Sequence, residues 1–213
     1  MRSLLISTSL VSSLLLPTIA AAQDFNVTYG ATLTSRYMFN GLEQTTGAAF
    51  QPFFEGEYQG FYAGLWASNT ARSIVGSSAE VDLYLGYRNE VGQFSYDLGY
   101  TRYYYQNPDF DCCGEVIFSM GFAPIDPLAV GVRFAHDPVA DYVNSSVSVD
   151  YAFNDQIAAA ATYGSISNGG HDYWSVGGAY AISDTFGIDL TWHDTSISSG
   201  LAVLSLTTAF NLR

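Results

Sequence analysis

The sequence predicts an all-β protein, specifically a transmembrane, antiparallel, up-and-down β-barrel of about twelve strands. Three observations lead to this fold class. The first 22 residues have the pattern of a secretory signal peptide, the rest of the chain alternates apolar and polar residues, and tight turns alternate with longer loops. A period of two indicates strands with one face in an apolar setting. Turns at one end and longer loops at the other are typical of outer-membrane barrels.

The signal peptide is predicted over residues 1–22. Arg2 supplies a positive charge, residues 4–16 are mostly apolar, and Ala20-Ala21-Ala22 provides small residues before a cleavage site. The apolar stretch is too short and too often interrupted by serine to span a bilayer as a helix, which needs about 20 apolar residues. We therefore expect cleavage after Ala22, export, and one barrel domain over residues 23–213.

The composition fits a barrel wall in lipid. Removing residues 1–22 from the 213 leaves 191, enough for one domain. All seven basic residues are Arg, and without Arg2 six Arg stand against 20 acidic residues, a net charge of −14. This acidity argues against nucleic-acid binding, which needs basic patches. Aromatic residues make up 15% of the chain and charged residues only 13%, as expected for an exported chain that faces lipid.

The strands follow from the alternation, which is clear over Phe25–Thr34, Val81–Arg88 and Phe94–Tyr100. Most of the predicted strands have about the length that a tilted strand needs to cross the hydrocarbon, which is roughly 9–11 residues. The twelve predicted strands are residues 25–37, 47–58, 61–69, 79–89, 92–104, 114–124, 127–136, 142–153, 156–164, 171–182, 185–194 and 200–212.

The connections between these strands are of two kinds. The tight turns are Gln59-Gly60, Glu90-Val91, Ile125-Asp126, Asn154-Asp155 and Ser183-Asp184. The longer loops, rich in Gly, Ser, Asn and Asp, are residues 38–46, 70–78, 105–113, 137–141, 165–170 and 195–199. Because the two kinds alternate, all tight turns share one end of the barrel, which we expect to face the periplasm.

A closed barrel in lipid sorts residues onto two faces, because outward positions meet hydrocarbon and inward ones may be polar. The predicted lipid-facing residues are Leu83, Leu85, Leu98, Val130, Val132, Val149, Ile188 and Leu190. The predicted inward-facing, pore-lining residues are Glu55, Asp82, Arg88, Asp97, Glu115, Arg133, Asp150 and Asp189. Aromatic residues expected at the membrane interfaces are Tyr58, Tyr87, Tyr103, Tyr151 and Trp192.

Three segments of the N-terminal half resemble motifs of the TorF family of outer-membrane porins. Residues 34–42 resemble its S-x-Y-x-F-x-G motif, residues 60–69 its Y-x-G-x-W-x-S-N strand, and residues 80–87 its E-x-D-x-Y-x-G-Y strand. The matches occur in the family's order, while the C-terminal half is similar only in texture. The resemblance implies an outer-membrane channel and carries no catalytic or ligand-binding residues.

The inward-facing charges are the main candidate site, because rings of charged side chains set the selectivity of a pore. Their six carboxylates against two Arg favour cations if the interior is open. The alternative is that they only pair with one another. Twelve strands leave an interior between that of a filled small barrel and that of an open porin, so both interpretations remain.

Two other groups of residues favour no chemistry. Residues 109–115 place carboxylates beside Cys112 and Cys113 without a full set of metal-ligand spacings, so we expect a solvated acidic loop and no metal or cofactor. Whether these two cysteines form a disulfide stays open. His136, His171 and His193 each precede an Asp, but no nucleophile motif accompanies them, and we expect no catalytic role.

The sequence thus favours a non-enzymatic, passive channel for small hydrophilic solutes or ions. The alternatives are a closed barrel with a structural or surface role and, less favoured, an outer-membrane hydrolase. We expect outer-membrane lipids and lipopolysaccharide around the barrel. We also expect the barrel assembly machinery to act on the chain during biogenesis. This machinery recognises an aromatic residue at the end of the last strand, and here Phe210 is followed by three further residues.

Overall fold

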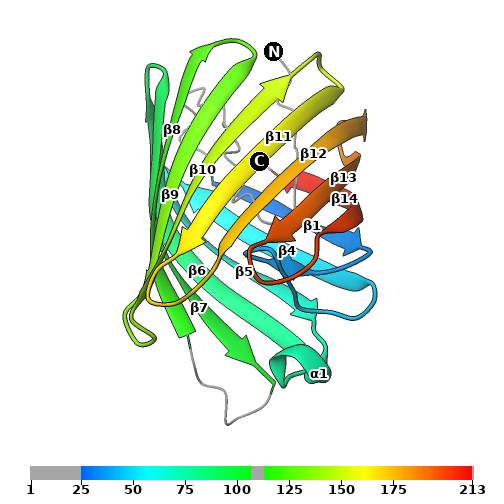
Figure 1. Ribbon diagram of the computed structural model, residues 1–213. Helices are drawn as coiled ribbons and strands as arrows, with labels where there is room; N and C mark the ends of the chain where they lie inside the picture. Colours follow the sequence, from blue (N-terminus) through cyan, green and yellow to red (C-terminus); the bar gives the residue numbers. More distant parts are fainter. Residues whose placement is uncertain (1–24, 107–112, 213) are drawn as a thin grey trace.

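The computed structural model describes residues 25–106 and 113–212, and the predicted signal peptide lies outside them. Twelve antiparallel strands close into one barrel (Figure 1). Each strand pairs with its neighbours along the chain, and β1 closes the sheet by pairing with both β4 and β14. The strands are β1 (Asn26–Thr34), β4 (Ala49–Tyr58), β5 (Phe61–Asn69), β6 (Ala79–Val91), β7 (Phe94–Tyr105), β8 (Cys113–Ile125), β9 (Leu128–Asp137), β10 (Tyr142–Ala152), β11 (Ile157–Ile166), β12 (Asp172–Ser183), β13 (Phe186–Thr195) and β14 (Leu201–Leu212).

The predicted fold class is confirmed, because each predicted strand has a counterpart in the barrel. The turn at Gln59-Gly60 is also where the sequence places it. The other tight turns were placed up to two residues away. The turn after β6 falls at Gly92-Gln93 rather than Glu90-Val91, where Gly92 takes a positive φ of 64° that glycine adopts without steric cost.

The two faces of the wall differ as the alternation predicts. Outward residues expose large apolar side chains, with Leu83 49% and Leu85 59% exposed, while Tyr84 between them and Asp82 before them face the interior. All eight residues predicted to face lipid lie on this outer face. Among the aromatic residues predicted to lie at the membrane interfaces, the prediction for Tyr103 is wrong. Its side chain points inward and is only 7% exposed.

Two elements were missing from the sequence prediction. The first long loop contains a short hairpin, β2 (Met38–Phe39) and β3 (Leu42–Glu43). The second contains a single helical turn, α1 (Arg72–Val75), which lies at the lower end of the barrel in Figure 1. Both elements are too short for their hydrophobic periodicity to be recognised in the sequence.

No helix within residues 25–106 and 113–212 is long and apolar enough to cross a membrane.

The two faces generate a test with adjacent residues of β10. Val149 is on the outer face and 47% exposed, whereas Ser148 faces the interior. Val149→Arg should destabilise the folded barrel by about 2–4 kcal/mol if the residue lies near the bilayer midplane. Ser148→Arg should cost much less, because its side chain meets the polar interior. Urea titration in lipid vesicles, read by a heat-modifiable gel shift, measures both, and equal losses would contradict the assignment of faces.

Candidate functional site in the barrel interior

All eight predicted inward-facing charges lie on the interior face of the barrel. Their positions along the strands divide them into two tiers. The tier towards the tight turns comprises Glu55, Arg88, Asp97, Asp150 and Asp189. The tier towards the longer loops comprises Asp82, Glu115 and Arg133. Whether these side chains line an open path stays a prediction.

Arg88 organises the tier near the tight turns. Its Nε and Nη2 bind Oε2 of Glu57, at 3.0 and 2.5 Å, and Nη2 also contacts Glu55 on the same strand. The guanidinium lies over the ring of Tyr62, 4.4 Å from the centroid, which adds a cation–π contact. These pairs join β4, β5 and β6 along one side of the wall. They leave about a fifth of the surface of each charged side chain accessible to water.

Tyr62 continues this cluster towards β7. Its hydroxyl donates to Oδ1 of Asp97 across β6, at an oxygen–oxygen distance of 2.6 Å. The side chain can cross β6 because Gly86 lies beneath it: a Cβ at that position would come within 2.5 Å of the Tyr62 hydroxyl. Glycine therefore provides the space that connects the two strands.

Glu115 is the centre of the tier near the longer loops. It is fully buried and accepts hydrogen bonds from the hydroxyls of Tyr103, at 2.7 Å, and Tyr142, at 2.9 Å. Arg133 lies 3.6 Å from its carboxylate. Tyr103 faces inward because it shares the parity of Asp97 on β7, and its hydroxyl has a charged partner there. The tendency of tyrosine to sit at a membrane interface does not override that parity.

Four of the predicted acidic residues have no cationic partner. Among the residues that the structure describes, Asp82, Asp97, Asp150 and Asp189 form no salt bridge, although Asp97 accepts the hydrogen bond from Tyr62. Asp189 accepts a long hydrogen bond from the Thr191 hydroxyl, at 3.4 Å. The interior therefore combines ion pairs on the β4–β9 side with unpaired carboxylates, and mutual pairing does not neutralise it.

The β2–β3 hairpin enters the barrel at the end that carries the longer loops. The loop from which it projects, residues 35–48, joins β1 to β4. Several residues of this loop are almost fully buried: Tyr37 at 6%, Met38 at 3% and Thr45 at 2% exposure. Burial of this extent in a loop requires that the wall surround it.

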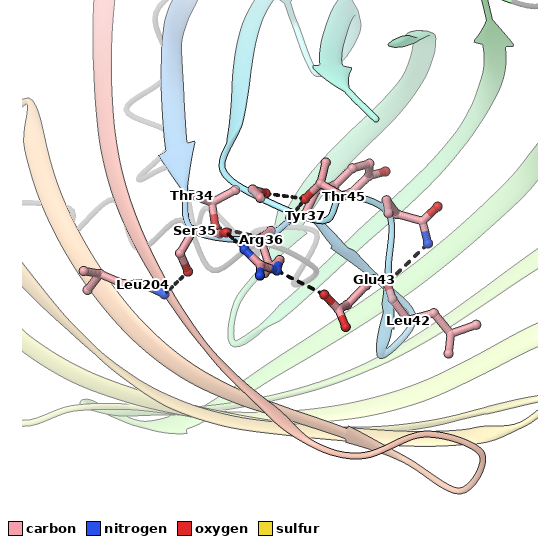
Figure 2. A network of polar contacts seen from close by, with 10 residues as sticks. Thr34, Ser35, Arg36, Tyr37, Leu42, Glu43, Thr45 and Leu204 are labelled. Atoms are coloured by element: carbon pink, nitrogen blue, oxygen red, sulfur yellow. Dashed lines mark hydrogen bonds and ion pairs between the residues drawn. The ribbon is translucent and has the colours of Figure 1, made fainter. Parts of the chain in front are cut away.

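The base of the hairpin is held by its own hydrogen bonds. The amide of Tyr37 donates to the Thr45 hydroxyl, at 2.9 Å, and Nε of Arg36 donates to Glu43, at 3.1 Å (Figure 2). The amide of Leu204 donates to the Ser35 hydroxyl and thereby ties the start of the loop to β14. The base is thus fixed close to the strands from which the loop emerges.

The tip of the hairpin, Asn40-Gly41, docks on a different part of the wall. Nδ2 of Asn144 on β10 donates to Oδ1 of Asn40, at 2.9 Å, and Nε2 of His171 lies 2.7 Å from the Asn40 carbonyl oxygen. Gly41 packs against Tyr173 and Thr195, on β12 and β13. The tip therefore contacts strands β10, β12 and β13, away from β4 and β5.

The aromatic rings of the loop contact the remaining side of the interior. Tyr37 packs edge-on against Trp66 of β5, with centroids 5.3 Å apart, and Phe39 packs against Tyr103 of β7, at 6.1 Å. Together with the docked tip, these contacts extend the hairpin across the interior from β5 and β7 to β10 and β12.

A local signal for this hairpin was present in the sequence. Asn40 and Gly41 both take positive φ, at 50° and 78°, as the two central residues of a tight hairpin turn often do. An Asn-Gly pair flanked by apolar residues is a strong indicator of such a turn, and here Met38-Phe39 precedes it and Leu42 follows. The direction of the hairpin, inward rather than outward, depends on partners far away in the sequence.

The three histidines do not assemble a catalytic site. His136 lies on the outer face and contacts the Tyr142 carbonyl oxygen, while His171 contacts the hairpin tip. His193 is 2% exposed in the interior, and its Nε2 has no partner. In the described part of the chain, no serine hydroxyl hydrogen-bonds to any of them.

The described residues also contain no group of three His, Cys, Asp or Glu side chains that could hold a metal ion. Most of the acidic segment considered for such a role, residues 109–112, lies outside them. Cys113 is disulfide-bonded.

The sequence matches one family model, described as "Bacterial protein of unknown function (Gcw_chp)", over residues 18–207. No curated protein matches the chain. The similarity of the N-terminal motifs to TorF porins is not part of these matches and stays a prediction.

Solved structures with the same fold are outer-membrane barrels. The KdgM porin superposes with a TM-score of 0.66 at 9% identity, covering 88% of this chain and 99% of that one. The NanC porin gives 0.55 at 12% identity, covering 87% and 98%. Outer membrane phospholipase A from Escherichia coli gives 0.52 at 12% identity, covering 87% and 90%. Identities this low establish a shared fold, which both porins and an enzyme use.

The contact between Tyr62 and Asp97 can be tested by stability. Tyr62→Phe should lower the free energy of unfolding by about 1–3 kcal/mol, because it removes a short hydrogen bond to a partly buried carboxylate. The matched control is Tyr163→Phe, which removes a hydroxyl from the outer face, where the side chain is 51% exposed. Urea unfolding in vesicles should separate the two variants, and an unchanged Tyr62→Phe would mean that the bond contributes nothing.

Proposed function

The chain belongs to the Gcw_chp family of bacterial proteins of unknown function, and we propose that it is an outer-membrane porin that passes small hydrophilic solutes or ions, with a preference for cations. The observation that carries the proposal is the excess of carboxylates on the interior face of a closed barrel. The shared fold with the KdgM and NanC porins supports a porin-like channel.

The charge of the interior supports the preference for cations. On the interior face of the described strands, ten carboxylates stand against Arg88 and Arg133 alone. These carboxylates are Glu55, Glu57, Glu80, Asp82, Glu90, Asp97, Glu115, Asp137, Asp150 and Asp189. A wall with this excess attracts cations and repels anions, since charged side chains around a pore determine which ions enter.

The same charge separates the expected solutes from those of KdgM. One KdgM structure holds a disordered oligogalacturonate, an acidic oligosaccharide. Each sugar of such a ligand carries a carboxylate, which the unpaired Asp150 and Asp189 would repel. We therefore expect cationic or neutral solutes here, even though the barrels share a fold.

The proposed location is the outer membrane, with the tight turns in the periplasm and the longer loops outside. The exposed apolar band on the outer face would contact lipid. Arg102 lies on the outer face near the longer loops, 5.7 Å from the centroid of the exposed Tyr104 ring, and lipopolysaccharide is the partner expected around this end of the barrel. Export by the signal peptide and insertion by the assembly machinery complete this proposal.

One observation favours a second candidate, a closed barrel with a structural or surface role. The hairpin lies across the interior and is buried there, as an occluded barrel would require. The arrangement of the three histidines favours no hydrolase.

Planar-bilayer recording of the refolded, signal-free protein tests the porin function. In a salt gradient, the reversal potential should show cation selectivity. The double variant Asp150→Asn/Asp189→Asn should reduce the cation-to-anion permeability ratio by about twofold or more, because it removes unpaired interior charges. The control, Asp155→Asn, removes an exposed charge from a tight turn and should leave the ratio unchanged.

Two results would count against this function. An anion-selective channel would contradict the inferred solute class. A silent bilayer, with folding verified by the heat-modifiable shift and with the hairpin displaced, would favour the closed barrel.

A further inference from the structure

We propose that the β2–β3 hairpin is a gate that closes the barrel when its tip is docked and opens it when the tip leaves Asn144 and His171. This inference rests on the proposed porin function and adds its regulation. The docked position is the one in the structure, so the structure represents the closed state.

The span of the hairpin is the first argument. Its loop starts at the end of β1, its rings rest on β5 and β7, and its tip reaches β10, β12 and β13. In the order of the closed sheet, β10 and β5 are separated by four strands on one side and by six on the other. A segment that contacts both therefore crosses the interior instead of lying along one part of the wall.

The burial of the wall residues that face the hairpin is the second argument. Asn144 is 1% exposed, and Glu80 on β6 is 2% exposed. Such values are expected for wall residues that the hairpin covers. By contrast, Arg88 and Glu57, towards the tight turns, each keep 21% of their side-chain surface accessible. Water therefore reaches the interior around Arg88 more readily than beneath the hairpin.

The unequal attachment of base and tip is the third argument. The base is held by backbone and side-chain bonds within the loop and to its neighbours: Gln44 donates to Tyr37, and Ala71 donates to Gln44. The tip is held through Asn40 by one side-chain bond from Asn144 and one contact with His171. The tip can therefore leave the wall while the base stays in place, which is how a hinged segment moves.

The seat of Gly41 provides a way to undock the tip. A Cβ there would lie 2.7 Å from Cβ of Tyr173 and 2.8 Å from Cγ2 of Thr195, and the backbone has a φ of 78°. Gly41→Ala therefore cannot keep the docked position. Gly47→Ala is the matched control, since it changes the same loop at a position where a Cβ meets nothing within 4 Å.

A second variant undocks the tip by a different route. Asn144→Leu keeps a side chain of similar size, removes the donor to Asn40 and adds no charge to the interior. It leaves the backbone of the hairpin unchanged, so it tests the gate even if Gly41→Ala reduces the yield of folded protein.

Single-channel recording of the native protein and the three variants tests the gate, with each barrel first shown to be folded by its heat-modifiable shift. Gly41→Ala and Asn144→Leu should raise the conductance or the open fraction several-fold. Gly47→Ala should behave like the native protein.

Each other outcome overturns a specific claim. Equal conductance in all four proteins would show that the hairpin is no gate, while the porin function would stand. Silence in all four folded proteins would overturn the porin function and the gate with it, because undocking the tip would then open no path.

Discussion

The closure of the sheet is the constraint on which the rest of the structure depends. In a bilayer, each backbone N–H or C=O group without a hydrogen-bond partner costs several kcal/mol, and an open sheet edge has a whole row of such groups. The pairing of β1 with both β4 and β14 removes that edge. Once the sheet is closed, each residue of a strand belongs to the outer or the inner face. A charged side chain near the middle of a strand is then stable only on the inner face, where water or a polar partner can contact it.

The interior accommodates its charges unevenly. Between β4 and β9, Arg88 and Arg133 pair with carboxylates, and tyrosine hydroxyls bind Asp97 and Glu115. Between β11 and β14 the inner face is mostly small and hydroxylic: the Thr32 hydroxyl binds that of Thr207, and Ser205 binds Thr34 across the β1–β14 seam. Asp189 lies in this arc without an Arg. Because the pairing is uneven, several interior carboxylates of the described strands have no cationic partner.

Local alternation was enough to predict the twelve strands and the face of each predicted charge, because facing depends only on parity along a strand. It was less able to place the turns, since the alternation continues into them and only special residues such as Gly92 mark the bend. Tyr103 was misplaced because its residue type suggested a membrane interface, whereas its parity with the inward Asp97 on β7 places it inside, where its hydroxyl binds Glu115. The hairpin had a local signal at Asn40-Gly41, but its docking depends on Asn144, which is 104 residues away.

The same physics explains why a mobile element of such a barrel should lie inside it. The wall cannot open without exposing unpaired backbone to lipid, so the ladder between strands is not available for a conformational change. The hairpin makes side-chain contacts in a polar interior, where water can replace each hydrogen bond that is lost. Its free energy of displacement is therefore small compared with that of parting two strands.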